Sequence, residues 1–343
     1  MRINFLLPHL KPAGGVSVSL TFGHKLAERG HDVIAAIENS SFLSRLYRNF
    51  FNDHPLLPRG SKLRLKMVRS FKDLPDADVW MADSWKSAKK LYNLKTKAVK
   101  FQYIQHDERM YHGDPKVVEE VFRLPLIKFV NATWLQRMLK RDFNYEAEVM
   151  FNSVDCDLFN PNKRDRRPDD GLIKILLLHH DYGWKNSKEG AQIVMELKEK
   201  YPNVRLVLFG TRAKNIDLPH DEYHFNVFGE DLARLFANSD IFLGASIDDS
   251  RPLPHRWAMA SGCALATYDN VSSDDYAFNG ENSLVAEKGN REDLKNKVEE
   301  LIRDSELRRQ VIQSALVFVR KLPTWDEMTD KLENIFKKGL NQT

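Results

Sequence analysis

A glycine-rich loop follows the first apolar run of the sequence. Gly14 and Gly15 lie between the apolar residues 3–7 and a helical pattern that continues to about Arg29. Paired glycines let the backbone approach a ligand closely, and the start of a helix offers unpaired N–H groups to an anion. The loop is a candidate diphosphate contact, and an ordinary strand–helix turn is the alternative. It lacks the Gly-x-Gly-x-x-Gly fingerprint of dinucleotide-binding proteins, although Glu38 stands near the position of their ribose-binding acid.

A histidine follows another apolar run, Val99–Ile104, in the sequence Gln105-His106-Asp107-Glu108. Side chains just past a strand of a parallel sheet lie at the edge where ligands bind. His106 could act there as an acid, a base or a hydrogen-bond donor at neutral pH, and a capped loop histidine is the alternative. No second His or acid follows His106 at the spacing of a helical metal site, so we expect no bound metal.

The segment from Asp248 to Tyr268 is the most specific of the candidates. It predicts the end of a strand, an acidic loop, a short helix and another strand. Pro254 suits the first helical position, and Gly262 suits the C-terminal end of the helix.

Short apolar runs alternate with helical patterns along the chain, which indicates parallel sheets with crossover helices. The polar, Pro-bearing segment Leu158–Gly171 resembles an interdomain linker, and Asn52–Ser70 resembles a loop. We therefore expect an α/β chain with two Rossmann-like domains and a ligand in the cleft between them, outside the carboxyl ends of the strands. Strands are expected at residues 3–7, 32–37, 79–81, 99–104, 128–130, 148–151, 173–178, 204–209, 241–245 and 264–268.

Composition excludes several classes of protein. The 343 residues exceed what one hydrophobic core usually holds, so two domains are expected. Cys156 and Cys263 are the only cysteines, which excludes a disulfide framework or a cysteine-based zinc site and fits a reducing cytoplasm. No apolar stretch reaches the roughly 18 residues of a membrane span, and the N-terminal run is too short for a signal peptide. We expect a cytoplasmic protein, at most peripheral to the inner face of a membrane.

Charge is unevenly distributed along the chain. Residues 1–150 hold 25 Lys and Arg against 16 Asp and Glu, a net charge of +9, and the remainder holds 27 against 32, a net charge of −5. The asymmetry predicts an anionic partner for the first half, such as a membrane surface or an acidic acceptor, and a solvated basic face is the alternative. The basic run Arg59–Lys100 lacks the interleaved aromatic residues of single-strand binders, so we expect no nucleic acid.

In order and spacing, the Asp248 segment resembles the donor-binding segment of the family-4 retaining glycosyltransferases, which have the GT-B fold. Ala258-Met-Ala-Ser-Gly262 is similar to that family's Ala-Met-Ala-x-Gly sequence. Trp184-Lys-Asn and Gln105-His-Asp-Glu resemble the branch that contains bacterial rhamnosyltransferases. Further similar segments are Gly14-Gly15, Leu26-Ala-Glu-Arg-Gly-His-Asp-Val33, Asn152-Ser-Val-Asp155, Leu158-Phe-Asn-Pro161, Val204-Arg-Leu-Val-Leu-Phe-Gly210, Asn279-Gly-Glu-Asn-Ser-Leu-Val285 and Gly289-Asn-Arg-Glu-Asp-Leu294.

The resemblance implies an acceptor-side domain over residues 1–158, a donor-binding domain over 159–323, and a helix over 324–343 that crosses back to the first domain. It implies transfer of a sugar from a UDP-, dTDP- or GDP-linked donor to a glycan, a glycolipid or another acceptor, with retention at the anomeric carbon. It implies that the transfer needs no metal. It implies no cofactor either, because the nucleotide sugar is itself a substrate. The departing diphosphate must be neutralised while an oxocarbenium-like sugar forms.

Roles carry over to individual residues through the same resemblance. Lys185 matches the lysine that holds the leaving phosphate, and Gly15 with Gly14 matches the loop against the diphosphate. Asp249 matches an acid that touches sugar hydroxyls, and His106 matches a histidine near the reacting sugar. The further donor contacts implied are Asn152, His180, the backbone of Leu253, and Trp257.

Two of these positions depart from the family pattern. Trp257 replaces the glutamate that usually binds the ribose hydroxyls, and His180 replaces the phosphate-binding arginine. Trp257 could mark a donor without a ribose 2′-hydroxyl, such as a dTDP-sugar, or it could be a core residue on a short helix. A catalytically weak homologue acting as a binding or partner subunit is a second interpretation, and a nicotinamide-dependent oxidoreductase is a third.

Overall fold

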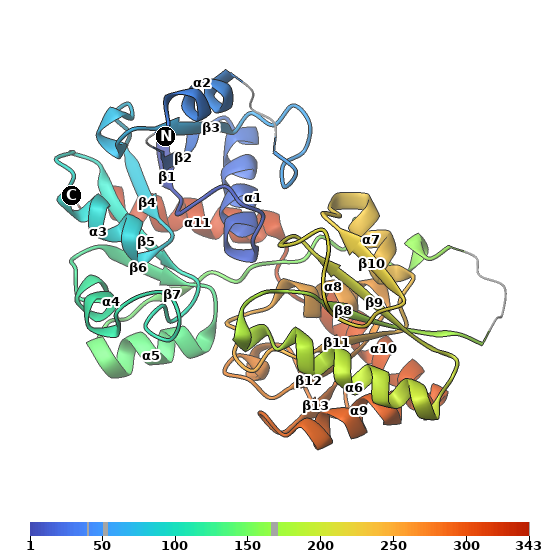
Figure 1. Ribbon diagram of the computed structural model, residues 1–343. Helices are drawn as coiled ribbons and strands as arrows, with labels where there is room; N and C mark the ends of the chain where they lie inside the picture. Colours follow the sequence, from blue (N-terminus) through green and yellow to red (C-terminus); the bar gives the residue numbers. More distant parts are fainter. Residues whose placement is uncertain (40, 51–53, 166–170, 343) are drawn as a thin grey trace. The chain divides into compact units, whose positions relative to one another are not determined.

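The computed structural model describes residues 1–39, 41–50, 54–165 and 171–342. The chain forms two compact units. Unit 1 comprises Met1–Asn152 and Pro323–Thr343, and unit 2 comprises Ser153–Leu322. The chain thus enters unit 2 after Asn152 and returns to unit 1 for its last helix (Figure 1).

Unit 1 is built on a parallel sheet of seven strands in the order β3-β2-β1-β4-β5-β6-β7. Most of its strands are short apolar runs buried on both faces, as a parallel sheet between helices requires. The strands are β1 (Arg2–Leu6), β2 (Asp32–Glu38), β3 (Arg64–Val68), β4 (Val79–Ala82), β5 (Val99–Ile104), β6 (Ile127–Val130) and β7 (Glu148–Val149).

Helices cover both faces of this sheet. α3, α4 and α5 pack on the face that carries Trp80, Ile104 and Val130. On the other face, Phe22 of α1 packs edge-on against Tyr103, and Phe336 of α11 packs against Phe101 with a centroid distance of 4.9 Å. The helices are α1 (Gly14–Glu28), α2 (Phe42–Phe50), α3 (Trp85–Asn93), α4 (Pro115–Phe122), α5 (Thr133–Phe143) and α11 (Trp325–Leu340), and a short 3₁₀ turn spans Phe71–Asp73.

The last helix of the chain belongs to unit 1. A capping box between Thr324 and Glu327 begins α11. Arg29, just past α1, donates to Asp330 of α11 at 2.6 Å. In Figure 1 this red helix lies among the blue and teal elements of the first sheet.

Unit 2 repeats the architecture with six parallel strands in the order β10-β9-β8-β11-β12-β13. These are β8 (Ile173–Leu178), β9 (Val204–Gly210), β10 (Glu222–Phe225), β11 (Ile241–Gly244), β12 (Ala264–Tyr268) and β13 (Leu284–Ala286). The helices are α6 (Ser187–Lys200), α7 (Gly229–Ala237), α8 (Leu253–Ser261), α9 (Arg291–Arg303) and α10 (Ser305–Arg320), and 3₁₀ turns span Pro161–Lys163, Gly183–Lys185 and Ser273–Asp275.

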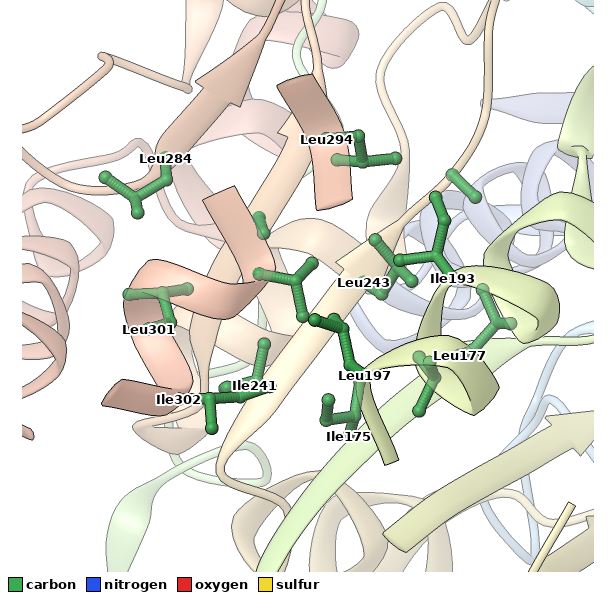
Figure 2. Close-up of a cluster of buried hydrophobic side chains, with 14 of the residues drawn as sticks. Ile175, Leu177, Ile193, Leu197, Ile241, Leu243, Leu284, Leu294, Leu301 and Ile302 are labelled. Carbon is green, nitrogen blue, oxygen red and sulfur yellow. The ribbon is translucent and has the colours of Figure 1, made fainter. Parts of the chain in front are cut away.

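Two apolar layers hold unit 2 together, one on each face of its sheet. The first packs α6 and α9 on one face of the sheet, and Figure 2 shows its aliphatic side chains, among them Ile175, Leu243 and Leu301. The second packs α7, α8 and α10 on the other face and contains Phe159, Phe236 and Phe242. Phe159 lies in the segment expected to be a linker, so the part of that segment around it is anchored in unit 2; residues 166–170 of the segment lie outside the described residues.

Three strands were not expected from the sequence. β3, β10 and β13 were missed, and β3 corrects the expectation of a loop over Asn52–Ser70, of which residues 52 and 53 lie outside the described residues. The prediction of two parallel-sheet α/β domains is confirmed. Within the described part of the chain, no helix has both the length and the apolar character needed to cross a membrane.

Candidate functional site

Both sheets have a point where the strand order reverses. In unit 1 it lies between β1 and β4, and in unit 2 it lies between β8 and β11. The loops that leave neighbouring strands there run to opposite faces of the sheet, which opens a crevice at the carboxyl ends where ligands of such sheets bind. The predicted site residues of unit 2 come from the loops that follow β8 and β11.

Lys185 and Asp249 meet across the crevice of unit 2. Lys185 ends the 3₁₀ turn that follows β8, Asp249 follows β11, and the ammonium of Lys185 forms an ion pair with Asp249 Oδ2. The same two loops are also joined through the backbone, because Ile247 N donates to Trp184 O at 2.9 Å. The structure therefore brings together, as an ion pair, two of the side chains predicted to belong to the site. Ser272 supports the second loop by donating to Asp249 O at 3.0 Å.

His180 lies in the loop after β8 and is kept neutral by its surroundings. Burial, together with the charges of Arg212 and Lys185, lowers its pKa to about 4. Nδ1 lies 3.1 Å from the backbone N of Tyr182, and Nε2 lies 3.2 Å from Arg212 Nε. A neutral imidazole accepts at one nitrogen only, so only one of these contacts can be a hydrogen bond. At neutral pH His180 carries no charge to offer a phosphate.

Arg212 is a residue of this region that the sequence analysis missed. It follows β9, the neighbour of β8 in the sheet, and its guanidinium carbon lies 5.0 Å from the ring centroid of Tyr182. Tyr182 in turn stacks on Trp184 at 4.3 Å. The signal that could have found Arg212 is its place two residues beyond a buried strand, at the same sheet edge as His180.

The helix α8 carries the other predicted donor contacts. Leu253 is its first residue and is buried, and Gly262 ends it with a left-handed φ of 74°, as expected. Trp257 stacks on Phe159 with ring centroids 5.0 Å apart and an interplanar angle of 4°. Its packing within the apolar layer of α7, α8 and α10 accounts for a large apolar residue at this position.

Two arginines are buried beside α8. Arg256 is fully buried, and its Nη2 donates to Arg251 O at 3.3 Å. Arg251 lies 3.8 Å from Asp275 across a weak, buried ion pair. His255, next to them, contacts the hydroxyl of Tyr276 at 2.8 Å, and burial lowers its pKa to about 3. This end of α8 is therefore a polar cluster within unit 2.

In unit 1, the glycine loop opens α1 directly. Gly14 and Gly15 are the first two residues of the helix, and no side chain caps it. Gln105 Nε2 donates to Gly15 O at 3.1 Å, and a Cβ on Gly15 would lie 3.4 Å from the same nitrogen. Gly15 thus lets the residue before His106 approach the loop, while nothing lies within 4 Å of a Cβ built on Gly14.

His106 stands among aromatic rings after β5. Its ring lies edge-on to Tyr111, His112 and Trp134, with centroid distances of 5.7, 6.1 and 6.3 Å. The structure therefore places this half-buried imidazole beside three aromatic rings, in the loop that follows β5.

Two carboxyl groups with raised pKa values accompany it. Burial raises the pKa of Asp83, just past β4, to about 7 and that of Glu108 to about 8. Ser19 donates to Asp83 Oδ2 at 3.0 Å, and the backbone N of Trp85 donates to Glu108 at 2.7 Å. Oδ1 of Asp83 is buried and has no hydrogen-bond partner among the described residues. Two buried carboxyl groups with raised pKa values, Asp83 and Glu108, thus follow the carboxyl ends of β4 and β5.

Two further residues were candidates, Asn152 and Glu38. Asn152 is buried at the point where the chain leaves unit 1. Glu38, considered as a ribose-binding acid, accepts from the backbone N of Phe71 at 2.9 Å and forms an ion pair with Lys90. Across the described ranges, no group of three or more His, Cys, Asp or Glu side chains is arranged to hold a metal ion.

The second half of the chain matches a model of a known protein family. Residues 159–317 match the family model described as "Glycosyl transferases group 1", over almost all of unit 2. Unit 2 is therefore similar to the group 1 glycosyltransferases over these residues. The prediction of a glycosyltransferase is confirmed at this level, and its assignment to family 4 stays a prediction.

Comparison with solved structures shows that this chain has the GT-B fold. Sucrose-phosphate synthase from Thermosynechococcus elongatus has a TM-score of 0.78 at 13% identity, covering 100% of both chains. Anabaena HepE in complex with UDP-glucose has a TM-score of 0.75 at 14% identity, covering 98% of this chain and 100% of that one. A glycosyltransferase from Rickettsia africae has a TM-score of 0.71 at 15% identity, covering 100% and 99%. No curated protein matches the sequence.

Proposed function

We propose that this chain is a retaining glycosyltransferase that moves a sugar from a nucleoside diphosphate to a glycan, a glycolipid or another acceptor. The observation that carries the proposal is the pairing of Lys185 with Asp249 across the β8/β11 crevice of a group 1 glycosyltransferase domain. A cation and a carboxylate at one strand edge can bind two neighbouring parts of a nucleotide sugar, the diphosphate and the sugar hydroxyls.

The reaction needs negative charge on the leaving diphosphate to be neutralised as the glycosidic bond breaks. Lys185 is in place to do this, and Asp249 holds its ammonium until a phosphate arrives. In unit 1, the uncapped first turn of α1 at Gly14 and Gly15 offers backbone N–H groups to an anion. His106 and its aromatic neighbours would bind the sugar or its acceptor. We propose that the transfer needs no metal and that the donor carries UDP, dTDP or GDP.

The acceptor proposal rests on charge. The basic first half of the sequence suits a lipid-linked or otherwise anionic acceptor, and it suits peripheral contact with an anionic membrane surface. Membership of family 4, and of its branch with bacterial rhamnosyltransferases, is part of the same proposal.

A second candidate function is a catalytically weak homologue that binds a partner or a ligand. Two observations favour it: His180 is neutral where the family pattern has an arginine, and Trp257 is packed in the apolar layer where that pattern has a glutamate. Thermal-shift measurements with UDP, dTDP, GDP and ADP separate the two candidates. One nucleotide at about 100 times its dissociation constant should stabilise the fold by roughly 2.7 kcal/mol. No shift with any of the four would favour the binding subunit.

The Lys185→Ala variant tests the proposed role of the cation. We expect turnover of the nucleotide sugar to fall at least roughly tenfold, because a charge on the leaving phosphate is lost. The matched control is Lys188→Ala, which removes an exposed lysine from the first turn of α6. Equal turnover in the two variants would remove Lys185 from the site.

A further inference from the structure

The loop after β9 places a cation beside His180. β8 and β9 are neighbouring parallel strands, with Leu178 opposite Phe209, so their following loops leave the same edge of the sheet. Arg212 Nε lies 3.2 Å from His180 Nε2. The guanidinium therefore occupies space next to the position where the family pattern has its phosphate-binding arginine.

The charges of the other groups leave this guanidinium uncompensated. Lys185 is paired with Asp249, so that pair carries no net charge before a ligand enters. Among the described residues, no carboxylate lies within ion-pair distance of Arg212, whose contacts are His180 and the ring of Tyr182. Its side chain is partly exposed and its terminal amino groups can bind an anion.

The geometry around Arg212 also suits a phosphate. A guanidinium presents its N–H groups as a planar fork that matches two phosphate oxygens. Tyr182 supports one face of the guanidinium and is itself stacked on Trp184, which limits the positions that the fork can adopt. Lys185 and Arg212 both act on the His180 ring electrostatically, so both cations lie around one imidazole.

We propose that Arg212 is a phosphate-binding residue of the donor site and supplies the guanidinium that is absent at position 180. His180 then acts as a positioning residue whose uncharged ring faces Arg212 Nε and leaves the rest of the fork to the diphosphate. The inference rests on the proposed function, because it names a further residue for the same donor.

The test compares binding of a nucleoside diphosphate with binding of its nucleoside. Calorimetric titrations use whichever of UDP, dTDP, GDP and ADP binds the wild-type chain most tightly, together with the matching nucleoside. For Arg212→Ala we expect a dissociation constant at least ten times larger for the diphosphate and less than twofold changed for the nucleoside. Lys214→Ala, an exposed lysine of the same loop, is the matched control and should change neither value.

A second variant separates the lost charge from damage to the loop. Arg212→Ala combined with His180→Arg returns a guanidinium to the family position and should recover most of the lost diphosphate affinity. Diphosphate binding by Arg212→Ala that equals that of Lys214→Ala would overturn the inference and leave the proposed function standing. A wild-type chain that binds none of the four diphosphates would overturn the proposed function, and the inference with it.

Discussion

Asp83 and Glu108 are carboxyl groups that hold a proton at a higher pH than usual because unit 1 shields them from water. Burial raises their pKa values to about 7 and about 8. An aspartate of an unfolded chain has a pKa of about 4. Between these values the folded chain binds a proton that the unfolded chain has released. Their contribution to stability is therefore complete below about pH 4 and is lost as the pH rises towards 7 or 8.

The Asp83→Asn variant should make stability less dependent on pH. Asparagine keeps an oxygen for Ser19 and needs no proton, so at pH 8 we expect the free energy of unfolding to rise by about 2 kcal/mol relative to wild type. At pH 5 the two chains should differ little. Urea unfolding followed from pH 5 to 8 measures this, with the exposed Asp76→Asn as the control. A variant curve parallel to that of wild type would show that Asp83 is charged in the folded chain.

The residues of the site differed in how well the sequence predicted them. Lys185 and Asp249 were predicted through the resemblance to a known family, and the structure brings them into contact. Arg212 was missed because its neighbour His180 lies 32 positions away in sequence and meets it through strand pairing. Asp83 has no local pattern that distinguishes it from a surface aspartate, since its hydrogen-bond partner Ser19 lies 64 positions away in sequence.

At the scale of elements, the strands that were missed share a position. β3 and β10 lie at one edge of each sheet, and β13 lies at the other edge of the second sheet. Edge strands are less buried, so the residues of β3 and β10 need not form the apolar runs that mark central strands. β13 is apolar, but it has only three residues. β3 reads Arg-Leu-Lys-Met-Val, and β10 reads Glu-Tyr-His-Phe. The central strands were predicted to within a few residues because they are buried on both faces and therefore form apolar runs.

The docking of α11 onto the first sheet should be sensitive to Gly339. A Cβ at this position would lie 2.6 Å from Phe101 Cζ and 3.1 Å from Ile127 Cδ1, both in the packed layer under the helix. Overpacking of about 1–3 kcal/mol should outweigh the gain in helix propensity of about 1 kcal/mol. We expect Gly339→Ala to lower the free energy of unfolding by about 1 kcal/mol.

The matched control for this variant lies on the same helix. Asn334 is exposed, so Asn334→Ala changes helix propensity without adding a contact and should raise stability slightly. Chemical denaturation of the two variants gives the comparison. If Gly339→Ala were as stable as Asn334→Ala, the helix would not be seated as closely as described.

At the scale of the whole molecule, unit 1 is discontinuous and unit 2 is not. Leu332 and Phe336 of α11 are fully buried in unit 1, although the rest of that unit ends at Asn152. A chain shortened to end at Leu322 would expose the face of the sheet around Phe101 to water. Hydrophobic burial dominates the stability of such a layer.

Hydrogen exchange on that shortened chain should separate the two units. We expect amides of β1, β4 and β5 to exchange at least roughly tenfold faster than in the full chain, while β8, β9 and β11 keep their protection. A chain that ends at Leu340 is the control and should match wild type. Uniform loss of protection in both units would show that they unfold as one.

Because the chain returns to unit 1 only for its last helix, unit 2 is fully synthesised before unit 1 is. All strands and helices of unit 2 have been synthesised before Trp325, so that unit can fold while the first remains incomplete. Until α11 emerges, nascent unit 1 presents Phe22 and Phe101 without the helix that packs on them. A chaperone that recognises apolar surface would therefore meet the N-terminal half of this protein for the whole time that unit 2 is being made.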